Sequence, residues 1–346
     1  MWAGSDGAAM STTARIPVAA VLAATALAAA GAAGATRSTA GPYGWPVKPF
    51  DRPHTIRGGF GDPRTLFAGP PSRRTLLTGG GLFSFHDGVD IAAPNGTPVY
   101  PVASGTVVRV TPQWLSVDTG GGRVFQYWHI RAAVTAGQRV EVDSTVLGRI
   151  LPSCGHVHLT ELEGGVPVDP LQPGHLTPYA DTTRPVVQSV AFRASITAAD
   201  ELPELLRGRV ELVASAYDTP SVPVAGPWHG LPVTPALLEW RVQTTKGRVA
   251  VPTHRVFDVR ATLPSGSAFW TVYARGTHQN MAVFGRHYSF MQPGAYLFRL
   301  SPGGFDTRTL PDGVYELVVT AADVAGNRGS LTQRFSVHNR PGVVGP

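Results

Sequence analysis

Residues 86–99 read HDGVDIAAPNGTPV, a pattern typical of two short β-strands joined by a turn. Val, Ile and Thr favour strands, whereas the Pro-Asn-Gly run at 94–96 favours a tight turn. The expected strands are 88–91 and 98–102. The same alternation of β-branched runs and turn residues continues over the flanking sequence. It predicts further strands at 105–110, 115–119, 124–129, 139–142, 146–150 and 157–162.

A second block begins after the polar stretch 181–185 and has longer strands in which apolar and polar residues alternate. Such alternation is typical of sheets with one buried and one solvated face, as in an immunoglobulin-like (Ig-like) β-sandwich. The expected strands are 209–217, 237–244, 248–251, 267–273, 295–300, 313–321 and 331–337. One short helix is expected at 198–207. The predicted fold class is all-β: a compact antiparallel β-sheet domain followed by an Ig-like β-sandwich.

The composition agrees with a globular protein rich in turns. The chain of 346 residues contains 40 Gly and 31 Pro, and its charged content of 15% excludes a disordered polyelectrolyte or a long coiled coil. The length suits about two domains. A formal net charge of +6 permits an anionic partner such as nucleic acid, a membrane surface or an acidic cell-wall polymer. The single cysteine, Cys154, excludes a disulfide framework and a Cys-based zinc ribbon.

The beginning of the chain is typical of an export signal. Arg15 precedes an apolar stretch at 16–30, and Ala-Gly-Ala at 33–35 supplies the small residues that a signal peptidase accepts. We therefore expect a signal peptide at 1–35. The alternative is an uncleaved anchor, because residues 16–35 are just long enough to span a bilayer. No later apolar run reaches that length, so no integral membrane domain is expected after cleavage. The mature protein is expected to be secreted or associated with the cell envelope.

Residues that suit a metal site are concentrated in the first block. His86 and Asp90 form His-x-Gly-x-Asp, His156 and His158 form His-x-His, and His129 lies between the two motifs. Residues two or four apart on a strand point to one face, so each pair is expected to project together. Imidazole and carboxylate are standard ligands of Zn²⁺, and catalytic zinc takes three protein ligands. Two histidines and one aspartate make such a set and leave two histidines for proton transfer. The alternative is a chance cluster of exposed polar residues.

These motifs resemble the M23 (lysostaphin/LytM-type) family of zinc metallopeptidases, which cut peptidoglycan peptides. The likeness covers about residues 60–170. It includes the runs 60–64, 86–99, 103–107, 127–130, 134–140 and 155–159. Three stretches depart from the family. The approach to His-x-His at 148–155 lacks the usual Gly/Ser/Thr-rich loop, and residues 159–161 read Leu-Thr-Glu where the family often has an aromatic residue and then Glu. The stretch 68–84 is long and suggests a lid or regulatory loop.

The resemblance implies a role for each residue of the two motifs. His86, Asp90 and His158 match the zinc ligands of the family, and His129 and His156 match its catalytic histidines. It therefore implies a LytM-like domain that binds Zn²⁺ and hydrolyses a peptide bond through a zinc-activated water. The alternative for His129 and His156 is a structural role in which they only orient the ligands.

We therefore expect a signal peptide at 1–35, a linker at 36–45, a zinc peptidase domain at 46–180 and an Ig-like accessory domain at 185–340. The expected function is that of an exported zinc metalloendopeptidase that hydrolyses peptide stems or cross-bridges of peptidoglycan. Peptidoglycan is thus the expected partner and nucleic acid is not, while the sequence leaves the oligomeric state open. Three alternatives remain: a non-catalytic homologue that binds the wall or activates a hydrolase, a zinc peptidase that acts on proteins, and a carbohydrate-binding or adhesion protein.

Several other residues have a plain structural interpretation. Glu161 is expected to be a solvated strand residue, and His54 and His175 are expected to be ordinary surface residues. Cys154 is interpreted as a small, semi-buried residue, with a thiol that reaches the metal as the alternative.

In the second block, the tryptophans are interpreted as core aromatics, with a sugar-stacking platform as the alternative. They are Trp228, Trp240 and Trp270. Three polar residues are interpreted as turn residues, with a Ca²⁺ site as the alternative. They are Asp218, Asp323 and Asn327.

Overall fold

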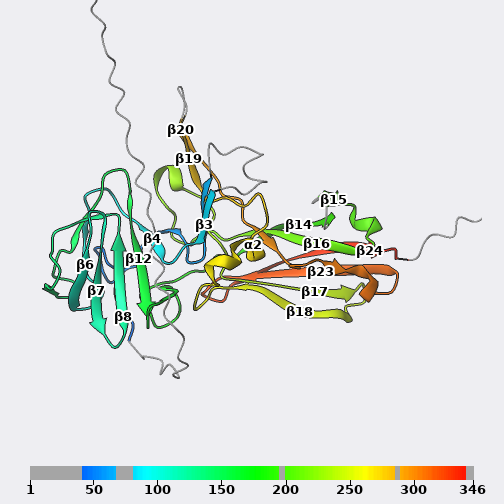
Figure 1. Ribbon diagram of the computed structural model, residues 1–346, viewed down its shortest axis with the longest axis horizontal. Coiled ribbons are helices and arrows are strands. Elements are labelled where there is room, and N and C mark those ends of the chain that lie inside the picture. Colours follow the sequence, from blue (N-terminus) through cyan, green and yellow to red (C-terminus); the bar gives the residue numbers. More distant parts are fainter. Residues whose placement is uncertain (1–40, 68–80, 195–198, 285–288, 340–346) are drawn as a thin grey trace, which may run out of the picture. The chain divides into compact units, whose positions relative to one another are not determined.

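The computed structural model describes residues 41–67, 81–194, 199–284 and 289–339 (Figure 1). The expected signal peptide and residues 68–80 of the expected lid lie outside these ranges. Nearly all regular structure in the described part is strand, and the sheets are antiparallel, so the predicted all-β class is confirmed. The helices in this part of the chain are short, and none has the length and apolar character needed to cross a membrane.

The first β region is built on one large antiparallel sheet, in the order β1-β4-β12-β8-β7-β6-β10, with β13 paired to β12. Its strands are β1 (Ile56–Gly58), β4 (Val89–Ala92), β6 (Gly105–Val110), β7 (Trp114–Gly120), β8 (Arg123–Trp128), β10 (Arg139–Val140), β12 (His156–Glu163) and β13 (Val166–Val168). A smaller sheet has the order β5-β11-β9, with β5 (Pro98–Val99), β9 (Ile130–Ala132) and β11 (Gly148–Ile150). The hairpin of β2 (Pro63–Phe67) and β3 (Gly81–Phe85) completes the region.

Strand β12 is central because it pairs with both β4 and β8. Its first six residues are all buried, so both faces of the strand are covered. The pairing places His158 opposite Asp90 of β4 and opposite Trp128 of β8. The register of three neighbouring strands therefore brings the two predicted metal-site motifs together.

The burial of β12 corrects the expectation for Glu161. Its side chain is 0% exposed and forms an ion pair with Arg123. Glu161 also accepts hydrogen bonds from the hydroxyl of Tyr43 and from Nδ1 of His175. A solvated Glu161 was the wrong prediction because a central strand with two covered faces exposes neither set of side chains. His175 is accordingly tied to the core, whereas His54 is half-buried and lies 2.8 Å from the carbonyl of Pro49.

The expected linker contributes to the same core. Tyr43 and Trp45 are 5% and 0% exposed, and the indole Nε1 of Trp45 donates to the carbonyl of Pro178. The predicted strand 98–102 is shorter than expected. Beyond β5, the amide of Tyr100 turns to the carbonyl of Pro46, and Pro101 has no N–H to extend a ladder.

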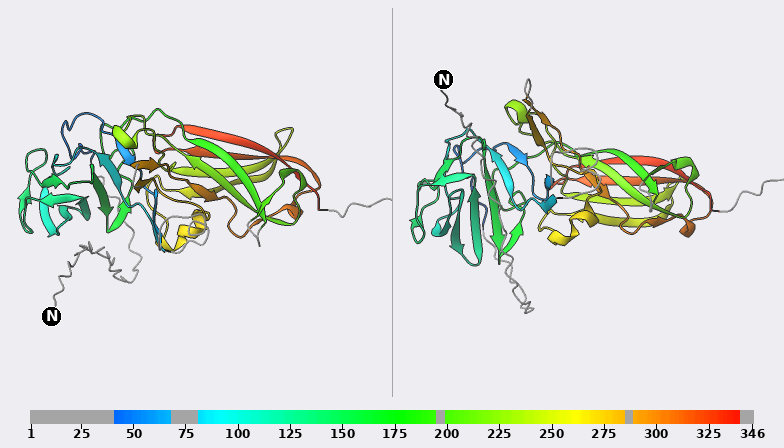
Figure 2. Two further views of the ribbon diagram at one scale, coloured as in Figure 1. Left: turned by 90° about the horizontal axis from the view of Figure 1, so that it is seen from above. Right: turned by 45° about the horizontal axis from the view of Figure 1, so that its top comes forward.

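The second β region contains two antiparallel sheets, one in the order β15-β14-β16-β21 with β22 paired to β16, the other in the order β18-β17-β23-β24. Figure 2 shows the long strands of this region running side by side. Their bounds are β14 (Val186–Ala194), β15 (Asp200–Glu201), β16 (Arg209–Tyr217), β17 (Leu237–Thr244), β18 (Val249–Asp258), β21 (Leu297–Arg299), β22 (Phe305–Asp306), β23 (Gly313–Ala322) and β24 (Arg328–Val337). A separate hairpin joins β19 (Met281–Phe284) to β20 (Ser289–Gln292).

Side chains from the two sheets pack against each other. The rings of Phe192 on β14 and Phe335 on β24 lie 5.5 Å apart. Trp240 on β17 donates its indole N–H to the carbonyl of Leu300. Tyr315 on β23 donates its hydroxyl to the carbonyl of Pro311 and so braces the turn before its own strand. These contacts agree with the alternating pattern from which a sandwich was predicted, and the Ig-like topology stays a prediction.

Two predicted elements of this region were wrong. The expected strand at 267–273 is a 3₁₀ turn, η3 (Gly266–Ala268), followed by the short helix α2 (Phe269–Val272). The helical turn brings the rings of Phe269 and Tyr273 to 5.1 Å. Among the described residues of 198–207, the expected helix is replaced by β15 and the 3₁₀ turn η1 (Pro203–Leu205). Pro203 lacks the N–H that a longer helix would need.

Buried hydrogen bonds connect the β2–β3 hairpin region with loops of the second region. The amide of Thr234 donates to Asp62, and the hydroxyl of Tyr273 donates to the carbonyl of Gly61. The amide of Gln279 donates to the hydroxyl of Thr65. The described residues accordingly belong to one compact unit, and these hydrogen bonds place loops of the second region beside the hairpin. The predicted domain boundaries remain predictions.

Candidate metal centre

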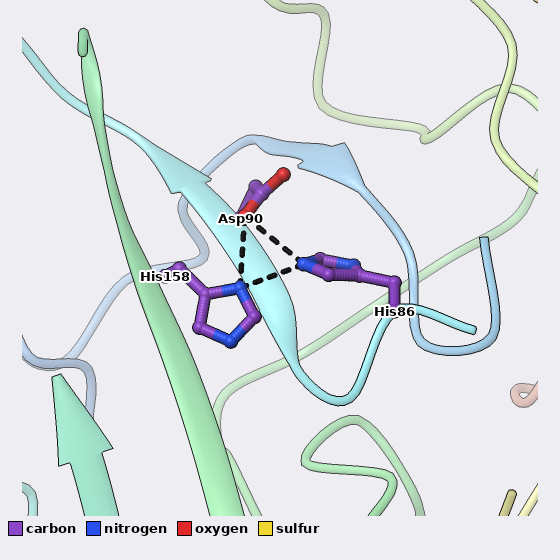
Figure 3. Close-up of side chains that lie close together, drawn as sticks. All are labelled: His86, Asp90 and His158. Carbon is purple, nitrogen blue, oxygen red and sulfur yellow. Dashed lines mark hydrogen bonds and ion pairs between the residues drawn. The ribbon is translucent and has the colours of Figure 1, made fainter. Parts of the chain in front are cut away.

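The three predicted zinc ligands point toward one another (Figure 3). Nε2 of His86 lies 2.7 Å from Nδ1 of His158, and each of these nitrogens lies 3.2 Å from Oδ1 of Asp90. Asp90 projects from β4 and His158 from the neighbouring β12. Two imidazole nitrogens and one carboxylate oxygen are the donor types that catalytic zinc takes from proteins.

The backbone around His86 differs from the predicted strand. β4 begins only at Val89, so His86 lies in the preceding bend and reaches Asp90 through that bend. Its amide donates to the carbonyl of Asp62, and its own carbonyl accepts from the amide of Gly61. Gly88 is needed for close approach, because a Cβ there would lie 2.3 Å from the carbonyl oxygen of Leu159. The glycine of His-x-Gly-x-Asp therefore lets the bend pack against β12.

Hydrogen bonds on the far side of each imidazole set its orientation. Nδ1 of His86 donates to the carbonyl of Gly59 at 2.7 Å, which leaves Nε2 as an acceptor toward the centre. Nε2 of His158 lies 2.7 Å from the hydroxyl of Thr160 and 3.4 Å from the carboxylate of Asp87. Such outer partners fix the rotation and tautomer of ligand histidines.

The three converging atoms need one positive charge among them. Burial lowers the pKa of His86 to about 4, so His86 is neutral near pH 7. Burial also opposes the charge on His158, but hydrogen bonds to Asp87 and Asp90 outweigh it and raise the pKa of His158 to about 9. Either a proton on His158 or a metal ion can supply the charge. The two imidazole nitrogens and the carboxylate oxygen therefore fit a Zn²⁺ ion.

Asp90 is oriented by Arg64 of β2. Nη2 of Arg64 donates to Oδ2 of Asp90 at 2.7 Å, while Nη1 lies 3.6 Å from Asp62. Gly58 makes room for this pair, because a Cβ at Gly58 would lie 2.5 Å from Oδ2 of Asp90. One oxygen of Asp90 is thus engaged by the arginine and the other faces the histidines.

The two remaining histidines lie beside this cluster. The rings of His129 and His156 are 4.5 Å apart, and Nε2 of His156 lies 3.4 Å from Oδ1 of Asp90. Nδ1 of His156 donates to the carbonyl of Cys154, so Nε2 is the ring nitrogen left to accept or release a proton. Burial, and then the charge of His156, lower the pKa of His129 to about 4. His156 and His158 share one face, as their two-residue spacing predicts.

The backbone of His129 has φ +63°, a left-handed conformation that is uncommon for residues other than glycine. His129 stands between β8 of the large sheet and β9 of the small one, so the chain changes sheets at this residue. Strained residues of this kind persist where the surrounding structure holds them, and they cluster at functional sites.

The cluster opens into a cavity of about 410 Å³. All five predicted site residues line it. Eight further lining residues were not predicted as site residues: Arg57, Asp62, Arg64, Asp87, Trp128, Trp228, Gln279 and Asn280. Four of them, Asp62, Arg64, Asp87 and Trp128, fall within runs that carry the family resemblance, which is a usable signal. Gln279 and Asn280 come from the second β region, and no local pattern marks them.

The tryptophans of the second region have different surroundings. Trp240 is 5% exposed and belongs to the core, as predicted. Trp270 is half-buried and packs against the core beside Phe83 and Phe269, as predicted, whereas the core prediction was wrong for the half-buried Trp228. Trp228 also lines the cavity, whereas Trp270 stacks with the guanidinium of Arg275. Trp228 ends the 3₁₀ turn η2 (Gly226–Trp228), and Trp270 lies in α2.

Cys154 is half-buried, as predicted, and burial raises the pKa of its thiol. Within the part of the chain that the structure describes, no metal-type cluster includes it. Asp218 and Asp323 do come together, with Asp181 as the third carboxylate. Asn327 donates to Asp323 instead, as expected for a turn.

The sequence around the candidate metal centre matches a known protein family. The family model described as peptidase family M23 matches residues 84–170. This part of the chain is similar to M23 peptidase domains. The match includes every predicted ligand and catalytic histidine, so the resemblance is confirmed and the M23 match supports a peptidase-type function.

Three solved structures resemble parts of the chain. The SpoIIQ–SpoIIIAH pore-forming complex has 20% identity over 38% of this chain and 89% of that chain, with a TM-score of 0.29. A zinc-containing peptidase from Vibrio cholerae has 26% identity over 37% of this chain and 39% of that chain, with a TM-score of 0.29. The catalytic domain of the antimicrobial peptidase lysostaphin from Staphylococcus simulans has 20% identity over 34% and 90%, with a TM-score of 0.26. The match thus spans less than half of the Vibrio chain. No curated protein matches this chain.

Proposed function

We propose that the chain is an exported zinc metalloendopeptidase that hydrolyses peptide stems or cross-bridges of peptidoglycan. The observation that carries the proposal is the convergence of His86 Nε2, Asp90 Oδ1 and His158 Nδ1 at the base of an open cavity. The M23 match over the same residues supports it. When bound, zinc supplies Lewis-acid chemistry, which lowers the pKa of water and polarises a carbonyl oxygen.

The protein's own side chains supply orientation. Gly59 holds His86, Thr160 and Asp87 hold His158, and Arg64 holds Asp90. Each contact lies on the side of the ligand that faces away from the shared centre. Fixed ligands lower the reorganisation needed when charge develops in the transition state.

His156 supplies proton transfer, and His129 supplies a hydrogen bond to the reacting carbonyl. Nδ1 of His156 donates a hydrogen bond to the carbonyl of Cys154. Nε2 is therefore the nitrogen that takes a proton from water and returns it to the leaving amine. His129, neutral near pH 7 because its pKa is lowered to about 4, can donate its N–H to the developing negative charge on the carbonyl oxygen. Both rings line the cavity, within reach of a bound peptide.

The substrate class and the location rest on other support. The apolar stretch and small-residue pattern of 1–35 agree with export. The net charge of +6 suits approach to an anionic wall. The open cavity suits an extended peptide better than an enclosed small molecule.

The test uses purified protein from about residue 36 onward. Bound zinc is measured, and peptides released from purified peptidoglycan are compared for the unaltered protein and its His158→Ala variant. We expect about one zinc per chain, release of peptides by the unaltered protein, and loss of both in the variant. Zinc-loaded protein that binds peptidoglycan but releases no peptides would refute catalysis and favour a non-catalytic wall-binding homologue. His254→Ala, an exposed histidine outside the cavity, is the matched control.

A further inference from the structure

The side chain of Arg57 lines the cavity without a charge partner. Its guanidinium carbon lies 3.9 Å from the ring centroid of Trp228, and its Nε is buried without a hydrogen-bond acceptor. Within the described ranges, no carboxylate lies at ion-pair distance from it. A guanidinium that is partly desolvated and unpaired is costly, so its retention at the wall of a cavity points to an external anion.

The other charged residues of the cavity are paired. Arg64 contacts Asp62 and Asp90, and Asp87 contacts His158. A bound peptide therefore meets a positive charge at Arg57 that no carboxylate neutralises at contact distance.

Arg57 lies on the side of the cavity where the catalytic histidines stand. A Cβ at Gly155, the residue before His156, would lie 3.6 Å from Nη1 of Arg57. Arg57 and Trp228 also line a neighbouring hollow whose walls include Asn95 and Cys154. Apart from Arg57, that hollow has no Asp, Glu, Lys, Arg or His among its lining residues. A peptide that extends from the metal centre into this hollow passes the guanidinium.

We propose that Arg57, held against Trp228, binds a carboxylate of the peptide substrate and makes the enzyme selective for acidic peptides. This inference rests on the proposed function and deepens it, because it names the chemical class of the substrate. The planar guanidinium can hold a carboxylate by two parallel hydrogen bonds. Stacking on Trp228 restricts its rotation, so less side-chain entropy is lost on binding.

The first experiment compares two peptides that differ only in having a carboxylate or a carboxamide on the residue beside the cleaved bond. Pairs with the change on either side of the bond are tested with the zinc-loaded chain. For one side, we expect kcat/KM to favour the carboxylate by about 10-fold or more. In Arg57→Gln the ratio is expected to fall to near one, because kcat/KM on the carboxylate peptide falls.

Controls separate selectivity from folding. Arg275→Gln is the matched variant, because Arg275 is exposed and stacks on Trp270 at 4.0 Å but does not line the cavity. It is expected to keep the full preference. Arg57→Lys keeps the charge and loses the planar fork, and it is expected to keep less than half of the preference on a logarithmic scale. Zinc content and Tm are measured for every variant.

A binding experiment distinguishes failure of this inference from failure of the proposed function. Both labelled peptides are titrated by fluorescence anisotropy into His129→Ala and into His129→Ala with Arg57→Gln. If no peptide is hydrolysed but the carboxylate peptide binds more tightly only when Arg57 is present, the peptidase proposal fails and the carboxylate site stands. If peptides are hydrolysed without a carboxylate preference on either side, or if Arg57→Gln keeps the preference, the carboxylate site is refuted.

Discussion

Arg64 and Asp90 form a pair in which the arginine occupies one carboxylate oxygen and leaves the other to the metal centre. Nη2 of Arg64 lies 2.7 Å from Oδ2 of Asp90, whereas Oδ1 lies 3.2 Å from the nearest nitrogens of His86 and His158. Because Arg64 belongs to β2 and Asp90 to β4, the hairpin and the large sheet together set the angle of the carboxylate. A ligand held in this way presents one oxygen to the shared centre.

Arg64→Gln is expected to weaken zinc binding about 10–100-fold, the usual effect of losing a partner that orients a metal ligand. The glutamine leaves Oδ2 of Asp90 without its charged donor, so the carboxylate can rotate. Zinc affinity is measured by competition with a chromogenic chelator, and Arg275→Gln serves as the control. Unchanged affinity in Arg64→Gln would contradict the positioning role.

His86→Ala and His158→Ala are each expected to remove stoichiometric zinc and to lower peptidase activity below about one thousandth. Two remaining protein ligands are fewer than the three that a catalytic zinc site takes. Bound zinc is measured by atomic absorption after dialysis, beside His254→Ala. Retention of tight zinc in either variant would show that the ligand set is assigned wrongly.

His129→Ala and His156→Ala are expected to keep zinc and to lower kcat by about 10²–10⁴-fold, the usual contribution of a positioned proton-transfer group. Neither residue belongs to the three-residue cluster, although Nε2 of His156 lies 3.4 Å from Asp90. Zinc content and single-turnover hydrolysis are measured on the same samples. A loss of zinc that accounts for the loss of rate would assign these histidines to ligand orientation instead.

Glu161→Ala is expected to lower the free energy of unfolding by about 3–5 kcal/mol, because it leaves Arg123 as a buried unpaired charge. Arg123 is 5% exposed, so water cannot replace the lost carboxylate. Tyr43→Phe removes one hydrogen bond to the same carboxylate and is expected to cost about 1–3 kcal/mol. Denaturant unfolding measures both, and a larger effect for Tyr43→Phe than for Glu161→Ala would contradict this account.

Asp169 makes the stability depend on pH. Burial raises its pKa from 3.8 to about 7, so the folded chain holds this proton more tightly than the unfolded chain. The stabilisation is complete below about pH 4 and is lost as the pH rises through about 7. Asp169→Asn keeps an oxygen for the amide of Leu171 and removes the charge. Its Tm is expected to exceed that of the unaltered protein by about 2–4 °C at pH 8 and to equal it near pH 4. Asp51→Asn, an exposed substitution, is the control, and a difference in Tm that does not grow with pH would contradict the shift.

Strand patterns predicted much of the fold because the period of side-chain alternation is local. The strands 105–110, 209–217 and 237–244 were predicted with their observed bounds. The pattern failed at 267–273, where Phe269 and Tyr273 pack together at helical spacing. It failed for Glu161 too, because coverage of both faces of β12 depends on elements distant in sequence.

The sequence by itself determined the all-β class and the donor types of the metal centre. Short spacings such as His-x-His fix which side chains share a face, because the backbone geometry of a strand allows little else. Only the tertiary structure decided that Arg64 orients Asp90, that His86 reaches the centre from a bend, and that Arg57 stacks on Trp228. These relationships join residues from different strands and loops, and packing of the whole chain brings them together. No local pattern carries that information, since each contact depends on how separate segments of the chain pack against one another.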